Sequence, residues 1–221
     1  MDHPIIPEDE NRGPQILIIT GILVITAFLI VSLRVYVRVV ILKHLDWDDY
    51  IMFLAMAVVL VEMIVIIPQV GYGAGRHVQY IKPSSDIVKG LRLNFVTQPL
   101  CLLALCLTKI SVGVFLLRMT QKVRLRLFIW GTMTLTAAAS LANLLVVFLQ
   151  CKPLAFTWDT SIEGGVCMPL EYRKAAAFAN SGVSTSTDII FALLPVLLLR
   201  QVQIDLKIKI MIMSILSLGI L

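Results

Sequence analysis

The hydrophobic positions of this chain fall into long blocks, and the short segments between them hold most of the charged residues. Five blocks are complete and a sixth runs to the last residue: 16–33, 50–70, 93–117, 127–149, 175–199 and 208–221. Each complete block has about the 20 residues that a helix needs to cross a hydrocarbon layer of about 30 Å. Backbone groups in hydrocarbon must pair within their own segment, so these blocks predict transmembrane helices. The alternation typical of membrane barrel strands is not seen.

Composition agrees with this pattern. Apolar residues make up 58% and charged residues 15% of the 221, and the mean hydropathy is +0.90. A water-soluble domain carries about 25% charged residues, because its surface must be hydrated. The predicted fold class is therefore an all-α integral membrane protein, a polytopic helix bundle with five full transmembrane helices and a truncated sixth. We expect residues 1–221 to form a single transmembrane domain and residues 1–14 a short extracellular tail.

The distribution of Lys and Arg favours an N-terminus outside. Of the 19 Lys and Arg residues, Lys109 lies inside a block, ten fall in segments that would then face the cytoplasm, and eight fall in outer segments. Basic residues favour the cytoplasmic side. The net charge of +5 is then explained by attraction to anionic lipid and requires no nucleic-acid partner. The alternative is that the basic segments dock a cytosolic protein. We expect a multi-pass protein of the plasma membrane.

Two of the four cysteines, Cys151 and Cys167, flank a predicted outer loop. Disulfides form in oxidising compartments, and closing a loop of this length contributes about 3 kcal/mol of stability in the chain-entropy model. We predict a Cys151–Cys167 disulfide, with a bridge from Cys101 to this loop as the alternative. The three histidines do not cluster with the cysteines, so no metal site is expected.

Several polar residues interrupt the apolar blocks. A charged side chain at the middle of a bilayer costs at least about 2.5–3.5 kcal/mol, so it normally faces the bundle interior and a partner. Counted along the helices, Lys109 lies within reach of Asp188 or of Glu62. We predict a polar cluster in the core formed by Glu62, Lys109, Asn143 and Asp188. Two alternatives stay open: Lys109 extends to the inner headgroups instead, or the cluster fixes helix register without binding a ligand.

Short motifs follow one another in an order typical of one family. Arg34-Val-Tyr-Val-Arg38 leaves the first block, Asp48-Asp49-Tyr50 opens the second, and Lys109-Ile-Ser111 lies in the third. The remaining motifs are Gly73-Ala-Gly-Arg-His77, Cys151-Lys-Pro153, Trp158, Gly165-Val-Cys167, Asp188 and Pro195. Through these motifs the chain resembles the fungal rhodopsin-domain family, seven-helix membrane proteins of filamentous fungi that include receptor-like proteins. The resemblance implies an N-terminus outside and a seven-helix fold, of which this chain would be a C-terminally incomplete part.

The resemblance also implies a function. We expect a receptor-like protein that senses an external small-molecule or surface ligand of unknown identity and signals through its cytoplasmic loops to a cytosolic protein. Arg34, Arg38, Asp48 and Asp49 are the predicted cytoplasmic-face residues. Retinal is not expected, because rhodopsins carry the Schiff-base lysine in a last helix that this chain lacks. The alternatives are a membrane accessory protein or enzyme of fungal secondary metabolism, and a transporter. No catalytic constellation is visible, so enzymatic activity is not expected.

Overall fold

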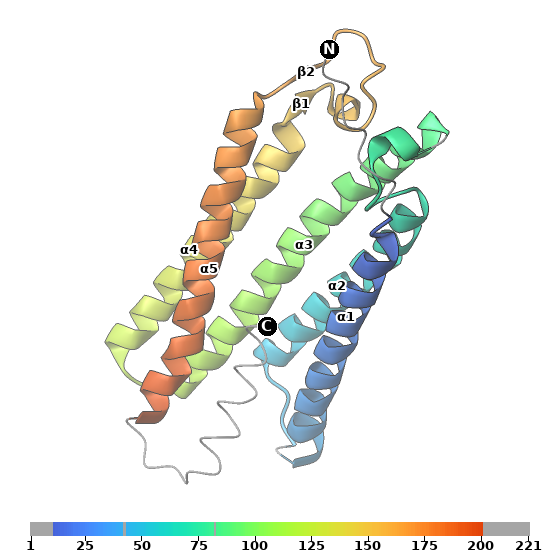
Figure 1. Ribbon diagram of the computed structural model, residues 1–221. Coiled ribbons are helices and arrows are strands. Elements are labelled where there is room, and N and C mark those ends of the chain that lie inside the picture. Colours follow the sequence, from blue (N-terminus) through green and yellow to red (C-terminus); the bar gives the residue numbers. More distant parts are fainter. Residues whose placement is uncertain (1–10, 42, 82, 201–221) are drawn as a thin grey trace, which may run out of the picture.

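The computed structural model describes residues 11–41, 43–81 and 83–200, and long helices dominate it (Figure 1). The five helices are α1 (Gly13–Tyr36), α2 (Trp47–Gly71), α3 (Ser84–Met119), α4 (Val123–Leu149) and α5 (Leu170–Arg200). Shorter elements are the π-helical turn η1 (Val37–Ile41), the 3-10 turns η2 (Val78–Tyr80) and η3 (Leu154–Thr157), and the strands β1 (Cys151–Lys152) and β2 (Val166–Cys167). The predicted sixth block, residues 208–221, lies outside the described residues.

Four helices of the described part are long and apolar enough to cross a membrane. They are Gly13–Ile41, α2, α3 and α4, and they correspond to the first four predicted blocks. The fifth block also forms a helix, but α5 is not among the four, and its middle holds Asn, Ser, Thr and Asp residues. The chain is therefore an all-α polytopic membrane protein, as its sequence predicts, and five full spans go beyond what these helices establish.

The helices begin where the sequence supplies start signals. Pro14 occupies the first turn of α1, a position where its missing N–H costs nothing. Helix α2 begins after Asp46, whose backbone N–H donates to the Asp49 carboxylate at 3.2 Å. Acidic residues in the first turn also suit the positive end of the helix dipole. Helix α3 begins at Ser84, nine residues before the predicted block at 93. The prediction started late because the first turns of this helix are polar, and hydropathy alone does not reveal them.

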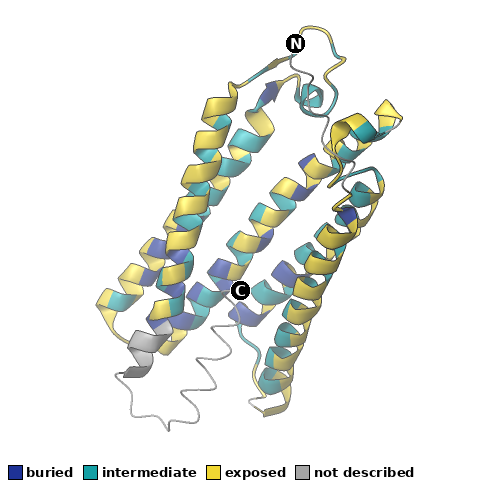
Figure 2. Ribbon diagram, viewed as in Figure 1, coloured by how far each residue is buried: buried dark blue, intermediate teal, exposed yellow. Residues whose placement is uncertain are grey.

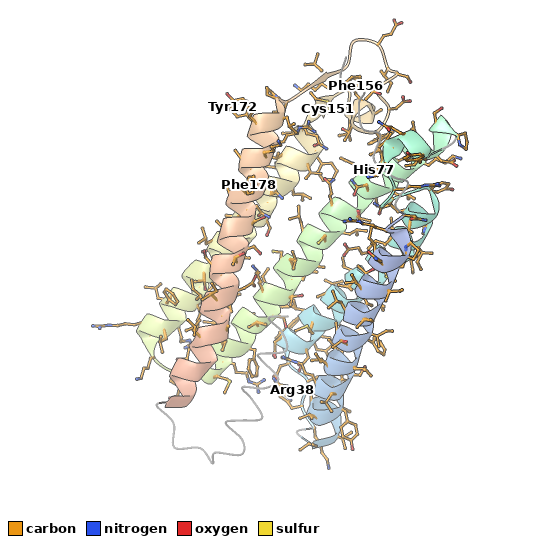
Figure 3. All side chains as sticks on the ribbon, in the orientation of Figure 1. Arg38, His77, Cys151, Phe156, Tyr172 and Phe178 are labelled. Atoms are coloured by element: carbon orange, nitrogen blue, oxygen red, sulfur yellow. A yellow bond between two sulfur atoms is a disulfide. The ribbon has the colours of Figure 1, made fainter. Side chains whose placement is uncertain are left out.

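Helix α3 occupies the centre of the bundle. Helix α2 packs along α3 and α1 packs on α2, while α4 lies on the other side of α3 and α5 contacts both α4 and α3 (Figure 1). The two ends of the bundle differ in character. We call the end with residues 11–12, η2 and the β1–β2 pair the disulfide end, and the end with η1 and the α3–α4 turn the arginine end. Figure 3 shows Cys151 and His77 at the first and Arg38 at the second.

The best-packed apolar core lies toward the arginine end, between α3, α4 and α5. It is formed by Leu116, Leu117, Ile129, Met133, Phe191 and Leu194. Gly113 allows this packing, because a Cβ atom there would lie 2.6 Å from the Met133 side chain. Large apolar side chains elsewhere point outward along the helices, as expected for surfaces that face lipid, and Figure 2 shows this exposed shell around the buried positions.

The predicted disulfide between Cys151 and Cys167 is confirmed, and it joins the antiparallel strands β1 and β2. Cys101 stays free on α3, so the alternative bridge does not form. Trp158 anchors the loop on α3, with its ring 5.3 Å from that of Phe95. At the tip of the loop, a hydrogen bond from the Ser161 hydroxyl and a second from its N–H hold the pKa of Asp159 below its ordinary value. The loop is therefore a folded cap.

Candidate functional site

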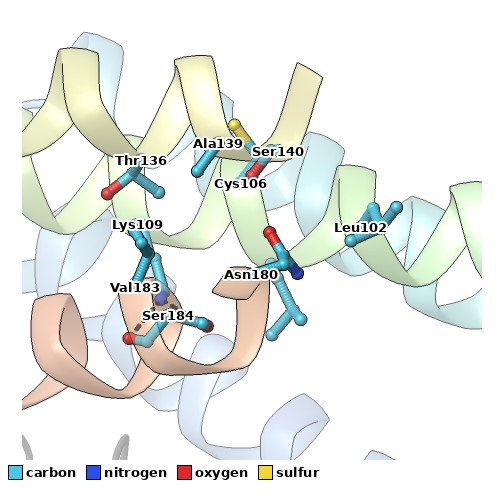
Figure 4. Close-up of a pocket in the computed structure, with 10 residues that line it drawn as sticks. Leu102, Cys106, Lys109, Thr136, Ala139, Ser140, Asn180, Val183 and Ser184 are labelled. Atoms are coloured by element: carbon cyan, nitrogen blue, oxygen red, sulfur yellow. Dashed lines mark hydrogen bonds between the residues drawn. The ribbon is translucent and has the colours of Figure 1, made fainter. Parts of the chain in front are cut away.

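A buried lysine links α3 to α5 in the interior of the bundle. Lys109 is 6% exposed, and its Nζ donates to the Ser184 carbonyl at 2.8 Å and to the Ser184 hydroxyl at 2.7 Å. The same Nζ lies 3.0 Å from the Thr187 hydroxyl and 3.1 Å from a carboxylate oxygen of Asp188. Figure 4 shows the Lys109 side chain reaching toward Ser184. A charge in a bilayer needs such partners, and here they all come from one turn of α5.

The predicted polar cluster is brought together only in part. Lys109 pairs with Asp188, whereas Glu62 lies on α2 beside the Cys101 thiol. Cys101 precedes Lys109 by eight residues on α3, which is about 12 Å along the helix, so Glu62 sits two turns away from the lysine. Asn143 lines a cavity between α4 and α5, and the hydrogen bonds and ion pair of the Lys109 amine go to Ser184, Thr187 and Asp188 instead. The prediction that Glu62 belongs to the Lys109 cluster is therefore wrong. It was based on depth along the helices, and depth does not determine which helix faces meet.

Two adjoining cavities lie near this lysine, which lines the smaller one. The first has a volume of about 20 Å³, enough for one water molecule. The second has a volume of about 200 Å³ and lies between α4 and α5. Ala139, Asn180 and Val183 line both cavities, so the two lie on opposite sides of these side chains or next to them.

A dense ionic cluster occupies the arginine end and includes all four predicted cytoplasmic-face residues. Arg34 donates to Asp49 at 3.0 Å and to Asp48 at 2.5 Å. Arg38 donates to Asp48 at 3.2 Å and to Asp46 at 3.0 Å. Asp48 is 1% exposed, so its charge depends on these arginines. The cluster therefore ties the end of α1 and η1 to the first turn of α2.

Helix α3 joins this ionic cluster through residues that the sequence analysis missed. The hydroxyl of Ser111 donates to the Asp48 carbonyl at 2.7 Å, and Arg118 pairs with Asp46. The ring of Phe115 lies 5.2 Å from the Arg34 guanidinium and 5.7 Å from that of Arg38. Ser111, Phe115 and Arg118 follow one another at i, i+4 and i+7, which places them on one face of the helix. This spacing is the feature of the sequence from which the three residues could have been predicted to act together.

The three carboxylates of Asp46, Asp48 and Asp49 lie within 4.8 Å of one another, close enough to hold a metal ion. However, each of them is already paired with an arginine from α1, η1 or α3. Three arginines against three aspartates leave no net negative charge to attract a cation. We therefore interpret this group as an ion-pair cluster that fastens helices.

Taken together, α3 carries two sets of polar contacts close to each other. Lys109 faces α5, and Ser111, only two residues further, faces the ionic cluster on α2. A shift of α3 relative to α5 would therefore act on the ionic cluster as well. This arrangement binds and orients helices, and among the side chains described in residues 11–41, 43–81 and 83–194 no set is arranged for catalysis.

Comparison with known proteins places the chain in a family. It is similar to a SAT4 family membrane protein of Emericella nidulans, with 25% identity over 156 residues that cover 67% of this chain. The match covers 38% of that relative, so the chain spans well under half of its length. No solved structure matches the chain. The profile of the fungal rhodopsin domain matches residues 33–221, as the order of the motifs predicted, and the chain therefore belongs to the fungal rhodopsin domain family.

Proposed function

We propose that this protein is a receptor-like membrane protein that senses an external small molecule and transmits a helix movement to a cytosolic partner. The bundle interior around Lys109 receives the signal, and the arginine end delivers it. The proposal involves no chemical step and no retinal. It extends to a plasma-membrane location and a seven-helix architecture.

One observation carries the proposal: a single helix holds both contact sets. Lys109 on α3 bonds to Ser184 and Asp188 of α5, and Ser111 on the same helix bonds to the backbone of Asp48 inside the ionic cluster. Signalling between two sites requires a structural element that can take two positions, and contacts at each site must favour one of these positions over the other. Helix α3 is suited to that role, because it contacts α2, α4 and α5.

The orientation that the proposal needs has its own support. The disulfide suits an oxidising exterior, and the arginine end carries the basic α3–α4 turn, which suits the cytoplasmic side. In this orientation α5 crosses the membrane as the fifth span. Its polar middle is offset by bonds to Lys109 and by hydrogen bonds of Thr187 and Ser186 within the helix.

Coupling between the two contact sets can be measured directly. Nitroxide labels are placed at the arginine end, on Trp47→Cys (Trp47 is 81% exposed) and on the exposed Gln121→Cys, in a chain whose Cys101 and Cys106 are replaced by alanine. Pulsed electron–electron double resonance then gives the distance between the labels in nanodiscs. We expect Lys109→Met to shift or broaden this distance distribution, because α3 loses its bonds to α5.

Lys89→Met is the matched control, because Lys89 is an exposed lysine on the same helix whose bond is to Asp86. That variant should leave the distribution unchanged. Identical distributions for Lys109→Met and the parent chain would show that the interior site does not move the arginine end, and the receptor proposal would fail.

A further inference from the structure

We infer that the cavity between α4 and α5 binds a small, uncharged, mostly apolar molecule with one hydroxyl or carbonyl group, which enters from the lipid. The inference deepens the proposed function, on which it rests for its biological role, by naming the class of ligand and its site. Binding itself can be measured separately from signalling.

The shape of the cavity sets the size of the ligand. Its volume is about 200 Å³, and six of its eight lining residues are alanine or valine. The complete lining is Ala139, Ala142, Asn143, Val146, Ala176, Ala179, Asn180 and Val183. Short side chains on facing helices leave the space open, whereas larger ones would close it. An apolar cavity of about 150 Å³ holds a benzene molecule, so a ligand with one ring fits here.

Two amides set the polar chemistry of the ligand. Asn143 on α4 and Asn180 on α5 line the cavity, and within the described chain neither side-chain amide has a hydrogen-bond partner. An amide offers two donors and an acceptor, and such a group in apolar surroundings is stabilised by any partner that reaches it. A hydroxyl or carbonyl group satisfies either amide, which a purely hydrocarbon ligand cannot do.

The electrostatics of the site favour an uncharged ligand. The charged residue in the lining of the adjoining small cavity is Lys109, and its charge is already paired with Asp188. An ionic group added beside Lys109 would therefore compete with Asp188 for the same amine, which disfavours a charged ligand at membrane depth. Asn180 and Val183 line both cavities, and Ser184, a partner of Lys109, lies on the next position of α5. A ligand at Asn180 thus adjoins the bond that links α5 to α3.

The cavity opens toward the bilayer rather than toward water. Ala142 and Ala179 in its lining are exposed, and their neighbours Leu141, Leu145 and Phe178 are exposed large apolar residues of the kind that face lipid. A molecule of the inferred class partitions into membranes, so it would reach the opening by lateral diffusion.

Photolabelling of the full chain in nanodiscs tests the inference. The probe is a trifluoromethyl-diazirine derivative of benzyl alcohol, and labelled residues are located by mass spectrometry after illumination. We expect labels on α4 and α5 around Asn143 and Asn180 that excess benzyl alcohol suppresses. Asn180→Leu should weaken saturable labelling about fivefold, the effect of one lost hydrogen bond. Asn94→Leu is the control, because Asn94 lies on α3 and bonds to Gln69.

A second pair of variants keeps the test independent of the asparagine. Ala139→Leu fills the cavity and should abolish saturable labelling, whereas Ala138→Leu, at the exposed neighbouring position outside the lining, should preserve it. Labelling that is spread evenly over the exposed faces of α1 and α4, or that persists in Ala139→Leu, would mean that only bulk lipid is sampled and would overturn the inference.

The two proposals fail separately. Saturable labelling without any change at the arginine end in the Lys109→Met distance experiment would leave the ligand site standing and remove the receptor function. Loss of the labelling with intact distance coupling would remove the ligand site alone.

Discussion

Lys109 shows how one buried charge is made tolerable inside a bundle. Four oxygen atoms from Ser184, Thr187 and Asp188 surround its amine within 3.1 Å. Three of these four acceptors are uncharged, and the fourth belongs to Asp188, whose side chain is 47% exposed. The lysine is therefore more deeply buried than the aspartate that neutralises it.

This asymmetry predicts unequal costs of mutation. Lys109→Met should destabilise the bundle by about 1 kcal/mol, because the remaining Asp188 carboxylate is half exposed and the Thr187 hydroxyl keeps its hydrogen bonds within α5. Asp188→Asn should cost about 3 kcal/mol or more, because it removes the negative charge paired with the buried Lys109 amine. Thermal unfolding in detergent, followed by tryptophan fluorescence, measures both. Equal losses for the two variants would contradict the asymmetry, and Lys89→Met serves as the surface control.

At the same scale, Phe115 places one aromatic ring beneath two arginines of the ionic cluster. Each cation–π contact contributes about 0.5–1 kcal/mol where the cation is partly hydrated. Phe115→Leu should therefore lower the free energy of unfolding by about 1–2 kcal/mol. Phe128→Leu, at an exposed phenylalanine of α4, should cause little change under the same assay. A loss of equal size in both variants would mean that packing area, not the arginines, determines the effect.

Between elements, the close approach of α3 and α4 at Met133 requires the absence of a side chain at Gly113. A Cβ atom at Gly113 would meet the Met133 side chain, whereas one at Gly131 on α4 would meet nothing within 4 Å. Membrane helices lack a hydrophobic force between them, so such close packing is a main source of their association. The buried core around Leu116 and Ile129 lies directly beside this contact.

The two glycines give a matched pair of variants. Gly113→Val should push α4 away from α3 and cost about 1–3 kcal/mol, the usual effect of overpacking. Gly131→Val should be close to neutral, because its side chain enters open space. The unfolding midpoint of each variant measures the difference. A neutral Gly113→Val would show that Met133 moves aside without cost and that α3 and α4 are loosely packed.

For the molecule as a whole, the two ends predict a membrane orientation. The disulfide end should face outward and the arginine end inward, because the disulfide needs an oxidising side and basic turns remain in the cytoplasm. In intact cells, a membrane-impermeant maleimide should label Ser85→Cys, at the start of α3, but not Gln121→Cys. Gln121→Cys should react only after permeabilisation. The opposite pattern would invert the topology and also the roles proposed for the two ends.

The sequence by itself determined the class of protein, its family and the main elements. The apolar blocks are long enough to cross a membrane, and a backbone in hydrocarbon must form its hydrogen bonds internally. These two facts together predict membrane helices. The sequence predicted the Cys151–Cys167 disulfide, because both residues flank one short segment between two predicted helices, but it left a bridge from Cys101 open until the structure showed Cys101 free. The start of α3 could not be found this way, since Asp86 and Lys89 make its first turns polar.

Only the tertiary structure decided which polar groups meet. Depth along a helix made Glu62 and Asp188 equal candidates for Lys109, but the rotation of each helix about its own axis places Glu62 beside Cys101 and Lys109 against α5. The same rotation puts Ser111, Phe115 and Arg118 on the ionic cluster and leaves the cavity at Asn180 open. Helix rotation is set by packing between neighbours, and a uniformly apolar sequence carries little information about which face turns inward.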